Sequence, residues 1–260
     1  MHLDPGIAAA GLLVGFTVGL TGMGGGALLT PLMILFFRVS PLAAVSSDLL
    51  VSLVMKPVGA SVHLRRGTVR TDLVKWLAIG SVPAAFAGVL LLKALGGDDL
   101  DPVVKHALGA ALILAAAAMI VKAQLNARRA TGAGGPAPAI VVRPIPTLAV
   151  GVAGGLVVGM TSVGSGSLII VLLLFLYPGL SSAELVGTDL VQAIPLVASA
   201  ALGHLLFGHV SLALTASLVV GALPGVYAGA RLSARAPERV VRPALFLVLL
   251  TSGLKLVQVI

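Results

Sequence analysis

The sequence predicts an all-α polytopic membrane protein made of two inverted-topology repeats, each a short helical hairpin plus three transmembrane helices. Composition, the order of the apolar stretches and an internal duplication lead to this fold class. Of the 260 residues, 58% are hydrophobic and 10% are charged, and the mean hydropathy is +1.12. Soluble domains are about 45–50% apolar and about 25% charged. Charges this sparse cannot cover a globular surface, so soluble enzymes and nucleic-acid-binding domains are all but excluded.

Long apolar stretches separated by short polar segments define the predicted elements. Repeat 1 covers residues 1-125, a linker covers 126-145, and repeat 2 covers 146-260. The hairpin and helices are predicted at 6-37, 43-63, 72-95 and 103-123 in repeat 1, and at 146-177, 183-205, 210-230 and 239-258 in repeat 2. A helical span takes about 20 residues, and these stretches are too long and too evenly apolar for barrel strands. The halves of each hairpin are shorter, so each hairpin is either re-entrant or a pair of short spans.

The duplication is visible in residue types that two apolar segments would not share by chance. At an offset of 140 the matched pairs include Gly15 and Gly155, Thr21 and Thr161, and Gly24 and Gly164. After a one-residue insertion the offset becomes 141, and the pairs include Asp48 and Asp189, His63 and His204, and Pro83 and Pro224. Glycine also recurs every fourth residue at 11, 15 and 19 and again at 151, 155 and 159, which predicts close helix packing.

Basic residues predict the orientation, because Lys and Arg collect in cytoplasmic loops. Four lie in each of the segments 65–75, 122–143 and 231–242, which accounts for most of the 17 basic residues and for the net charge of +8. The loop after 72-95 is acidic, whereas its counterpart after 210-230 carries arginines. Matched loops therefore lie on opposite sides of the membrane, as in many secondary transporters. The linker is predicted to be cytoplasmic and both termini extracytoplasmic, in the cell inner (cytoplasmic) membrane.

The glycine-rich tips of the two hairpins are the first candidate site. The residues predicted to bind substrate there are Gly22, Met23, Gly24, Gly25 and Gly26 in the first tip, and Ser162, Gly164, Ser165, Gly166 and Ser167 in the second. The helix that begins after each tip exposes N–H groups and a positive dipole end, which bind anions. Tips entering from opposite sides would meet near the midplane, where such transporters bind substrate. The alternative is that the glycines only turn the chain and allow close packing.

A polar stripe on the next helix of each repeat is the second candidate site. In repeat 1 it holds Asp48, Ser52, Lys56 and His63, and in repeat 2 Asp189, Gln192 and His204. Ionisable residues within a span are costly and point to function. Lys56 either neutralises an anionic substrate or forms a structural ion pair, and Gln192 is assigned to the substrate site. The aspartates either couple transport to protons or complement a helix dipole, and the histidines either contribute to coupling or gating or are satisfied residues near helix ends.

The polar residues offer two alternatives to an anion site. An intramembrane serine hydrolase would use Ser165 or Ser167 with His204 as base. The duplication argues against it, because Ser165 matches Gly25 and Ser167 matches Ala27. The chain has no cysteine, and its histidines and aspartates show no metal-ligand spacing, so no metal and no cofactor are expected.

The combined motifs resemble the TauE/SafE sulfite exporter family over nearly the whole chain. They are GLTGMGGG at 19–26, SSDLL at 46–50, KPVG at 56–59, HLRRGTV at 63–69, VGTDL at 186–190 and GALPG at 221–225. The resemblance implies transport of small sulfur-containing anions such as sulfite, sulfonates or thiosulfate. One departure is Ser46-Ser47 before Asp48, where the family often has Gly-Thr and repeat 2 keeps Gly187-Thr188. The two repeats are therefore expected to contribute unequally to the site.

The sequence as a whole predicts a secondary transporter that works by alternating access, with its site between the hairpin tips. It is expected to export a small inorganic or organosulfur anion, coupled to the proton gradient. An anion channel or uniporter with the same site is the first alternative, and the hydrolase is the second. The expected partners are the anion and the lipid bilayer, not nucleic acid. The oligomeric state stays open, with a homodimer among the options.

Overall fold

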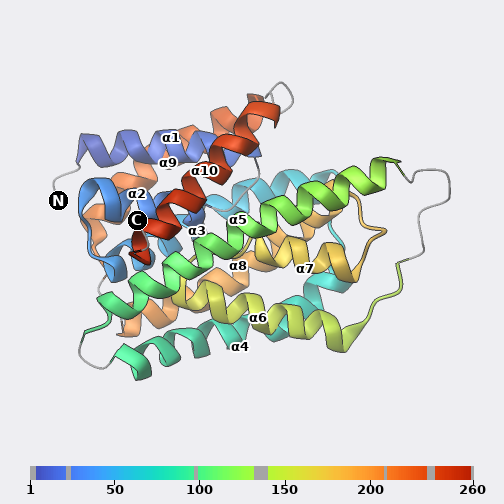
Figure 1. Ribbon diagram of the computed structural model, residues 1–260, viewed down its shortest axis with the longest axis horizontal. Coiled ribbons are helices and arrows are strands. Elements are labelled where there is room, and N and C mark those ends of the chain that lie inside the picture. Colours follow the sequence, from blue (N-terminus) through green and yellow to red (C-terminus); the bar gives the residue numbers. More distant parts are fainter. Residues whose placement is uncertain are drawn as a thin grey trace.

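The computed structural model describes residues 4–21, 25–96, 99–131, 140–207, 210–232 and 238–258. These residues form α-helices throughout, and no strand occurs among them (Figure 1). The helices are α1 (Pro5–Thr21), α2 (Gly26–Phe37), α3 (Pro41–Arg65), α4 (Thr71–Gly96), α5 (Asp101–Thr131), α6 (Pro144–Thr161), α7 (Leu168–Leu176), α8 (Ser182–Phe207), α9 (Leu212–Leu232) and α10 (Glu238–Leu256). The predicted all-α fold class is confirmed.

Six helices of the described chain are long and apolar enough to cross a membrane. They are α3, α4, α6 and α8, together with Asp101–Leu125 of α5 and Leu212–Gly229 of α9. Shorter apolar segments are Pro5–Gly19, Gly26–Phe37 and Phe246–Leu256. The second hairpin is uneven, because α6 has 18 residues and α7 has nine. The protein is therefore a polytopic membrane protein whose hairpins contain its shortest helices.

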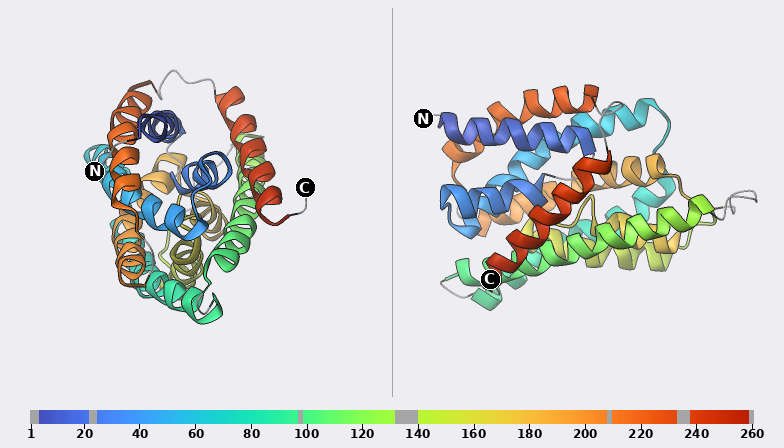
Figure 2. Two further views of the ribbon diagram at one scale, coloured as in Figure 1. Left: turned by 90° about the vertical axis from the view of Figure 1, so that its left-hand side faces the viewer. Right: turned by 45° about the horizontal axis from the view of Figure 1, so that its top comes forward.

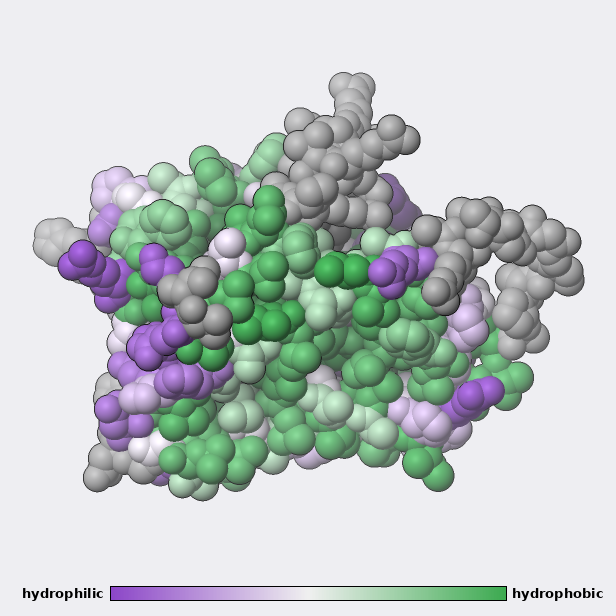
Figure 3. Space-filling view, in the orientation of Figure 1, coloured by the Kyte–Doolittle hydropathy of each residue, from purple (hydrophilic) through white to green (hydrophobic). Residues whose placement is uncertain are grey.

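The outer surface has the character expected of a bundle that faces lipid. A broad apolar band covers the middle of the molecule in Figure 3, and polar residues gather toward its ends. Large apolar side chains are exposed on the described surface, among them Leu13, Phe36 and Phe175. Contiguous exposed apolar surface of this extent is a membrane-contact feature rather than a soluble surface.

The short hairpin helices lie inside the bundle. Viewed along the bundle in Figure 2, α2 and α7 lie between the α8–α9 side and the α5–α10 side. The first half of α2 is buried from Gly26 to Pro31, and α7 buries Ile169, Ile170 and Leu173. An irregular backbone at the start of such helices is tolerated within a membrane only where protein buries it or water reaches it. Their interior position meets that condition.

Glycines bring the first helix of each repeat against the fourth helix of the other. A Cβ at Gly15 of α1 would lie 2.4 Å from the Ala222 carbonyl oxygen of α9, and a Cβ at Gly155 of α6 would lie 2.5 Å from the Ser81 carbonyl oxygen of α4. The two glycines are related by the offset of 140, and Ser81 and Ala222 by the offset of 141. The two contacts thus correspond residue by residue, and the glycines serve close packing as the spacing predicts.

The segment between the repeats differs from the predicted linker of 126-145. Helix α5 continues to Thr131 and α6 begins at Pro144, so helix occupies both ends of that range. Residues 132–139 lie outside the described chain. In Figure 1, α5 ends and α6 begins at the right-hand end of the bundle, whereas α1 begins, α4 ends and α5 begins at the left-hand end.

Candidate functional site

The second hairpin tip contacts both the first hairpin and α3. A Cβ at Gly26, the first residue of α2, would lie 2.3 Å from the Ser162 carbonyl oxygen and 2.8 Å from Asp48 Oδ2. The Ser162 hydroxyl donates a hydrogen bond to Asp48 Oδ2 at 2.5 Å. The two hairpin segments therefore touch through backbone, with the buried carboxylate of α3 beside the contact. Residues Gly22, Met23 and Gly24, also predicted for this site, lie outside the described chain.

The backbone of the second tip folds back on itself. Ser162, Gly164 and Gly166 have φ values of 60°, 133° and 88°, conformations that favour glycine at the latter two positions. The amides of Ser167, Leu168 and Ile169 all donate to the Gly164 carbonyl. These first amides of α7 thus have partners within the tip. The expectation that they are free to hold an anion needs revision, and side chains become the main candidate donors.

Lys56 is the buried cation of the site. Lys56 is 6% exposed, and its Nζ donates to Ser165 Oγ at 2.7 Å. No carboxylate among the described residues lies within 4.0 Å of Nζ. An ammonium group has three N–H donors, so the Ser165 contact accounts for only one of them. The hypothesis of a structural ion pair with an aspartate is therefore not supported by the geometry.

Asp189 lies in a hydrogen-bond network between α4 and α8. Gln192 Nε2 donates to Asp189 Oδ1 at 3.0 Å. The Ser81 hydroxyl in turn donates to Gln192 Oε1 at 3.2 Å. All three side chains are buried. The network joins the predicted residues Asp189 and Gln192 and adds Ser81.

Buried polar atoms without a partner gather around this site. Within the described residues they are Thr30 Oγ1 of α2, Ser47 Oγ and Asp48 Oδ1 of α3, and Ser167 Oγ of the second tip. Each such atom costs about 1–3 kcal/mol when it is left unsatisfied. All four atoms belong to the hairpins or to α3. The buried polar atoms of the described chain that lack a hydrogen-bond partner therefore lie on the elements that form the candidate site.

The two histidines are not part of this cluster. His204 is fully buried, with Nδ1 at 2.9 Å from Ser46 Oγ and Nε2 at 2.9 Å from the Gly159 carbonyl oxygen. His63 is half-buried, and its Nδ1 lies 2.9 Å from Thr68 Oγ1 near the end of α3. Both imidazole rings therefore have hydrogen-bond partners at contacts between helices or between a helix and a loop. This favours a structural or gating role over direct contact with a ligand.

The geometry also bears on the hydrolase and metal alternatives. The Ser165 hydroxyl contacts Lys56, not His204, whose two ring nitrogens have other partners. The serine–histidine pair that the hydrolase alternative requires is therefore not formed. Over the part of the chain that the structure describes, no group of three or more His, Asp or Glu residues is placed to hold a metal ion.

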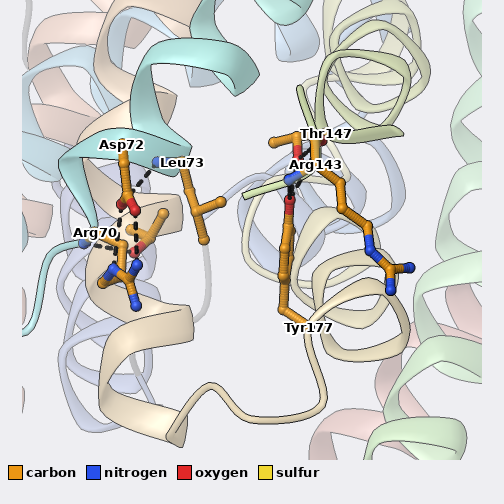
Figure 4. A network of polar contacts seen from close by, with 7 residues as sticks. Arg70, Asp72, Leu73, Arg143, Thr147 and Tyr177 are labelled. Carbon is orange, nitrogen blue, oxygen red and sulfur yellow. Dashed lines mark hydrogen bonds and ion pairs between the residues drawn. The ribbon is translucent and has the colours of Figure 1, made fainter. Parts of the chain in front are cut away.

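A separate polar network fixes the connection from α3 to α4 at one end of α8 (Figure 4). The Arg70 backbone N–H donates to Thr188 Oγ1 at 3.1 Å, and the Arg70 guanidinium pairs with Asp72 at 2.6 Å. The hydrogen bond to Asp72 raises the pKa of Arg70 above its ordinary value. Both charged side chains are partly exposed, so this ion pair adds little stability. The network is relevant to the candidate site because it includes Thr188, which directly precedes Asp189 in α8.

Three residues of the site were not predicted: Thr30, Ser47 and Ser81. Ser47 stands in the SSDLL motif and Thr30 lies on the predicted hairpin, but a hydroxyl in an apolar helix is usually bonded to its own backbone and gives no distinct signal. Ser81 sits beside Gly80 on a helix without charges in its middle. Its mismatch with Ala222 in the other repeat was the available clue, because Gly80 and Pro83 nearby match Gly221 and Pro224.

An all-helical bundle with this many candidate spans and a charged, buried centre defines a polytopic membrane protein with a central polar site. The profile of the sulfite exporter TauE/SafE family matches residues 7–256, and the chain belongs to this family. It is 39% identical over 253 residues to the "Probable membrane transporter protein YjnA" of Bacillus subtilis, covering 96% of this chain and 98% of that protein.

A second Bacillus subtilis relative, the "Probable membrane transporter protein YdhB", is 26% identical over 254 residues, covering 94% of this chain and 96% of that protein. The "Probable membrane transporter protein YunE" is 38% identical over 84 residues, 32% of this chain and 29% of that protein. No solved structure matches the chain. The family and these relatives identify a membrane transporter.

Proposed function

We propose that the protein is a secondary transporter that binds a small sulfur-containing oxyanion between the two hairpin tips and α3, and releases it on the other side by alternating access. The observation that carries this proposal is Lys56: a buried ammonium with no carboxylate of the described chain within 4.0 Å, hydrogen-bonded to Ser165 of the second tip. A buried charge without a partner is strongly unfavourable. A bound anion is the natural partner for such a group.

The unpartnered hydroxyls support an oxyanion in particular. Thr30, Ser47 and Ser167 each carry a buried hydroxyl without a hydrogen-bond partner. Sulfite and sulfonates present oxygen acceptors in several directions, which suits a site made of one ammonium and scattered O–H donors. The sulfur chemistry and the direction, export, come from the description of the family. Coupling to protons follows from the buried carboxylates, Asp48 and Asp189, next to the anion site.

We also propose that the two repeats are inverted about an axis in the membrane plane, with the site between them. The paired contacts of α1 with α9 and of α6 with α4 support this, because both follow the sequence offsets of the duplication. The basic residues at 65–75, 122–143 and 231–242 then face the cytoplasm. Both chain ends face the other side of the cytoplasmic membrane.

Cysteine labelling tests this orientation cleanly, since the chain has no cysteine of its own. A cysteine at Arg128 or at Arg66 is expected to react with a membrane-impermeant maleimide only after the cells are opened. A cysteine at Asp99, in the acidic connection, is expected to react in intact cells. Labelling of the Arg128 position in intact cells would reverse the orientation, and labelling of Arg66 and Asp99 from the same side would refute the predicted path of α4.

The proposed substrate class is tested by binding and flux on purified wild-type protein. Calorimetry with sulfite, thiosulfate, sulfate and methanesulfonate is expected to show saturable binding of at least one anion, and chloride serves as the control. In proteoliposomes the flux of that anion should saturate and should respond to an imposed pH difference. Flux that ignores the pH difference and shows channel-like conductance would favour the channel or uniporter alternative.

A further inference from the structure

Asp189 accepts a hydrogen bond from a fixed amide. Gln192 Nε2 donates to Asp189 Oδ1 at 3.0 Å. The Ser81 hydroxyl donates to Gln192 Oε1 and so fixes the Gln192 amide with its N–H groups toward Asp189. An ionised carboxylate is purely an acceptor, and hydrogen bonds from N–H groups to it are strong. The Gln192 amide therefore stabilises the ionised form of Asp189 more than an environment without such a donor would.

Asp48 has a different environment at the matching position. Its Oδ2 accepts from the Ser162 hydroxyl, but its buried Oδ1 has no hydrogen-bond partner among the described residues. The groups that face it from α2 are neutral: the Thr30 hydroxyl and the backbone at Gly25, whose Cβ would lie 3.7 Å from Oδ1. The charged group that acts on Asp48 is Lys56 of its own helix. The free oxygen is a site where a proton can sit.

The formal charges of the cluster explain why a proton is needed. Asp48 and Asp189 together bring two negative charges, and Lys56 brings one positive charge. Lys122 of α5, which is half-buried, also acts on Asp189. The charged group that acts on Asp48 is Lys56. An anion bound by Lys56 would therefore meet the negative charge of Asp48, which is unfavourable unless Asp48 is neutralised.

We propose that Asp48 alone takes up the proton that accompanies the anion, while Asp189 stays ionised within its own hydrogen-bond network, with Ser81 as a positioning residue that acts through Gln192. This inference rests on the proposed function. The two repeats differ at the residues that create the division of roles, since the counterparts of Gln192, Ser81, Ser162 and Lys56 are Val51, Ala222, Gly22 and Val197. The duplication therefore placed two carboxylates at equivalent positions, and later divergence of their neighbours separated their roles.

The test measures anion binding and proton uptake together on purified protein. Calorimetry uses the tightest binder among thiosulfate, sulfate and methanesulfonate, none of which titrates between about pH 5 and pH 8, in buffers of different ionisation enthalpy. Wild-type protein is expected to take up one proton per anion, with a Kd that rises about tenfold per pH unit on the alkaline side. Asp48→Asn is expected to lose both the proton uptake and the pH dependence. Asp189→Asn and the exposed control Asp99→Asn are expected to keep the proton uptake.

The outcomes separate the inference from the proposed function. Binding by wild-type protein without proton uptake, or proton uptake that survives Asp48→Asn, would overturn the inference and leave an anion transporter. Proton uptake that is lost in Asp189→Asn instead would assign the proton to the other carboxylate. Failure of wild-type protein to bind any of the anions would overturn both proposals.

Ser81→Ala tests the positioning role with a readout that packing alone would not move. Without the Ser81 hydroxyl, the Gln192 amide is no longer fixed, and Asp189 loses a reliable N–H donor. The proton uptake per anion is then expected to rise above one, because Asp189 begins to titrate with Asp48. A melting temperature close to that of wild-type protein shows that the fold is intact. An unchanged stoichiometry of one would refute the role of Ser81.

Discussion

Replacing Lys56 with methionine is expected to weaken anion binding by roughly two to three orders of magnitude without loss of folded protein. Methionine keeps an unbranched apolar chain in the buried position and removes only the ammonium group. Losing one partner of a buried charge pair costs about 3–5 kcal/mol, and Lys56 has no carboxylate of the described chain within 4.0 Å to replace the anion. Calorimetry with the best-binding anion and a thermal melt of the same preparation measure both quantities.

Lys75→Met is the matched control, because Lys75 is an exposed cation on α4. Its removal changes the net charge by the same amount and should leave the affinity within about threefold of wild type, since exposed charges act weakly through water and salt. Wild-type affinity in Lys56→Met would instead assign Lys56 a structural role. Equal losses in both variants would show that overall charge, rather than a specific site, attracts the anion.

The sequence was sufficient to predict the all-α polytopic fold and the elements that build the site. Composition and stretch length lead to helices, and the described chain is helical in each predicted stretch, although α5 continues past its predicted end to Thr131. Lys56 and Asp48 were identifiable because an ionisable residue in a span is costly. The structure places both beside the second hairpin tip, where Lys56 contacts Ser165 and Asp48 contacts Ser162.

The pairing across repeats could not be predicted from the sequence. Periodicity places Asp48 and Lys56 on one face of one helix but does not say which hairpin faces them, and both charged groups of repeat 1 contact the tip of repeat 2. The hydrogen-bond partners of the first α7 amides could not be predicted from the sequence either. Glycine allows the positive φ values at Gly164 and Gly166, but only the folded tip shows that its first amides turn back to the Gly164 carbonyl.

The contact between the hairpin tips leads to a second large expected effect, from Gly26→Ala. A methyl group at Gly26 would lie 2.3 Å from the Ser162 carbonyl oxygen and 2.8 Å from Asp48 Oδ2. The first of these atoms is backbone and cannot rotate away, so the tips must separate. Overpacking of this kind costs about 1–3 kcal/mol, and separation of the tips also breaks the Ser162–Asp48 hydrogen bond. Anion flux in proteoliposomes is therefore expected to fall at least about tenfold.

Gly59→Ala is the control on the neighbouring helix, because its added methyl would meet the flexible end of Leu190 at 3.3 Å, which can shift. Its flux and melting temperature should stay close to wild type. Gly26→Ala should lower the flux far more than the melting temperature, since α2 and the second tip can part locally while the glycine-packed pairs of α1 with α9 and α4 with α6 remain. Full flux in Gly26→Ala would show that transport does not depend on contact between the tips, and the anion site would then have to lie on α3 and a single hairpin.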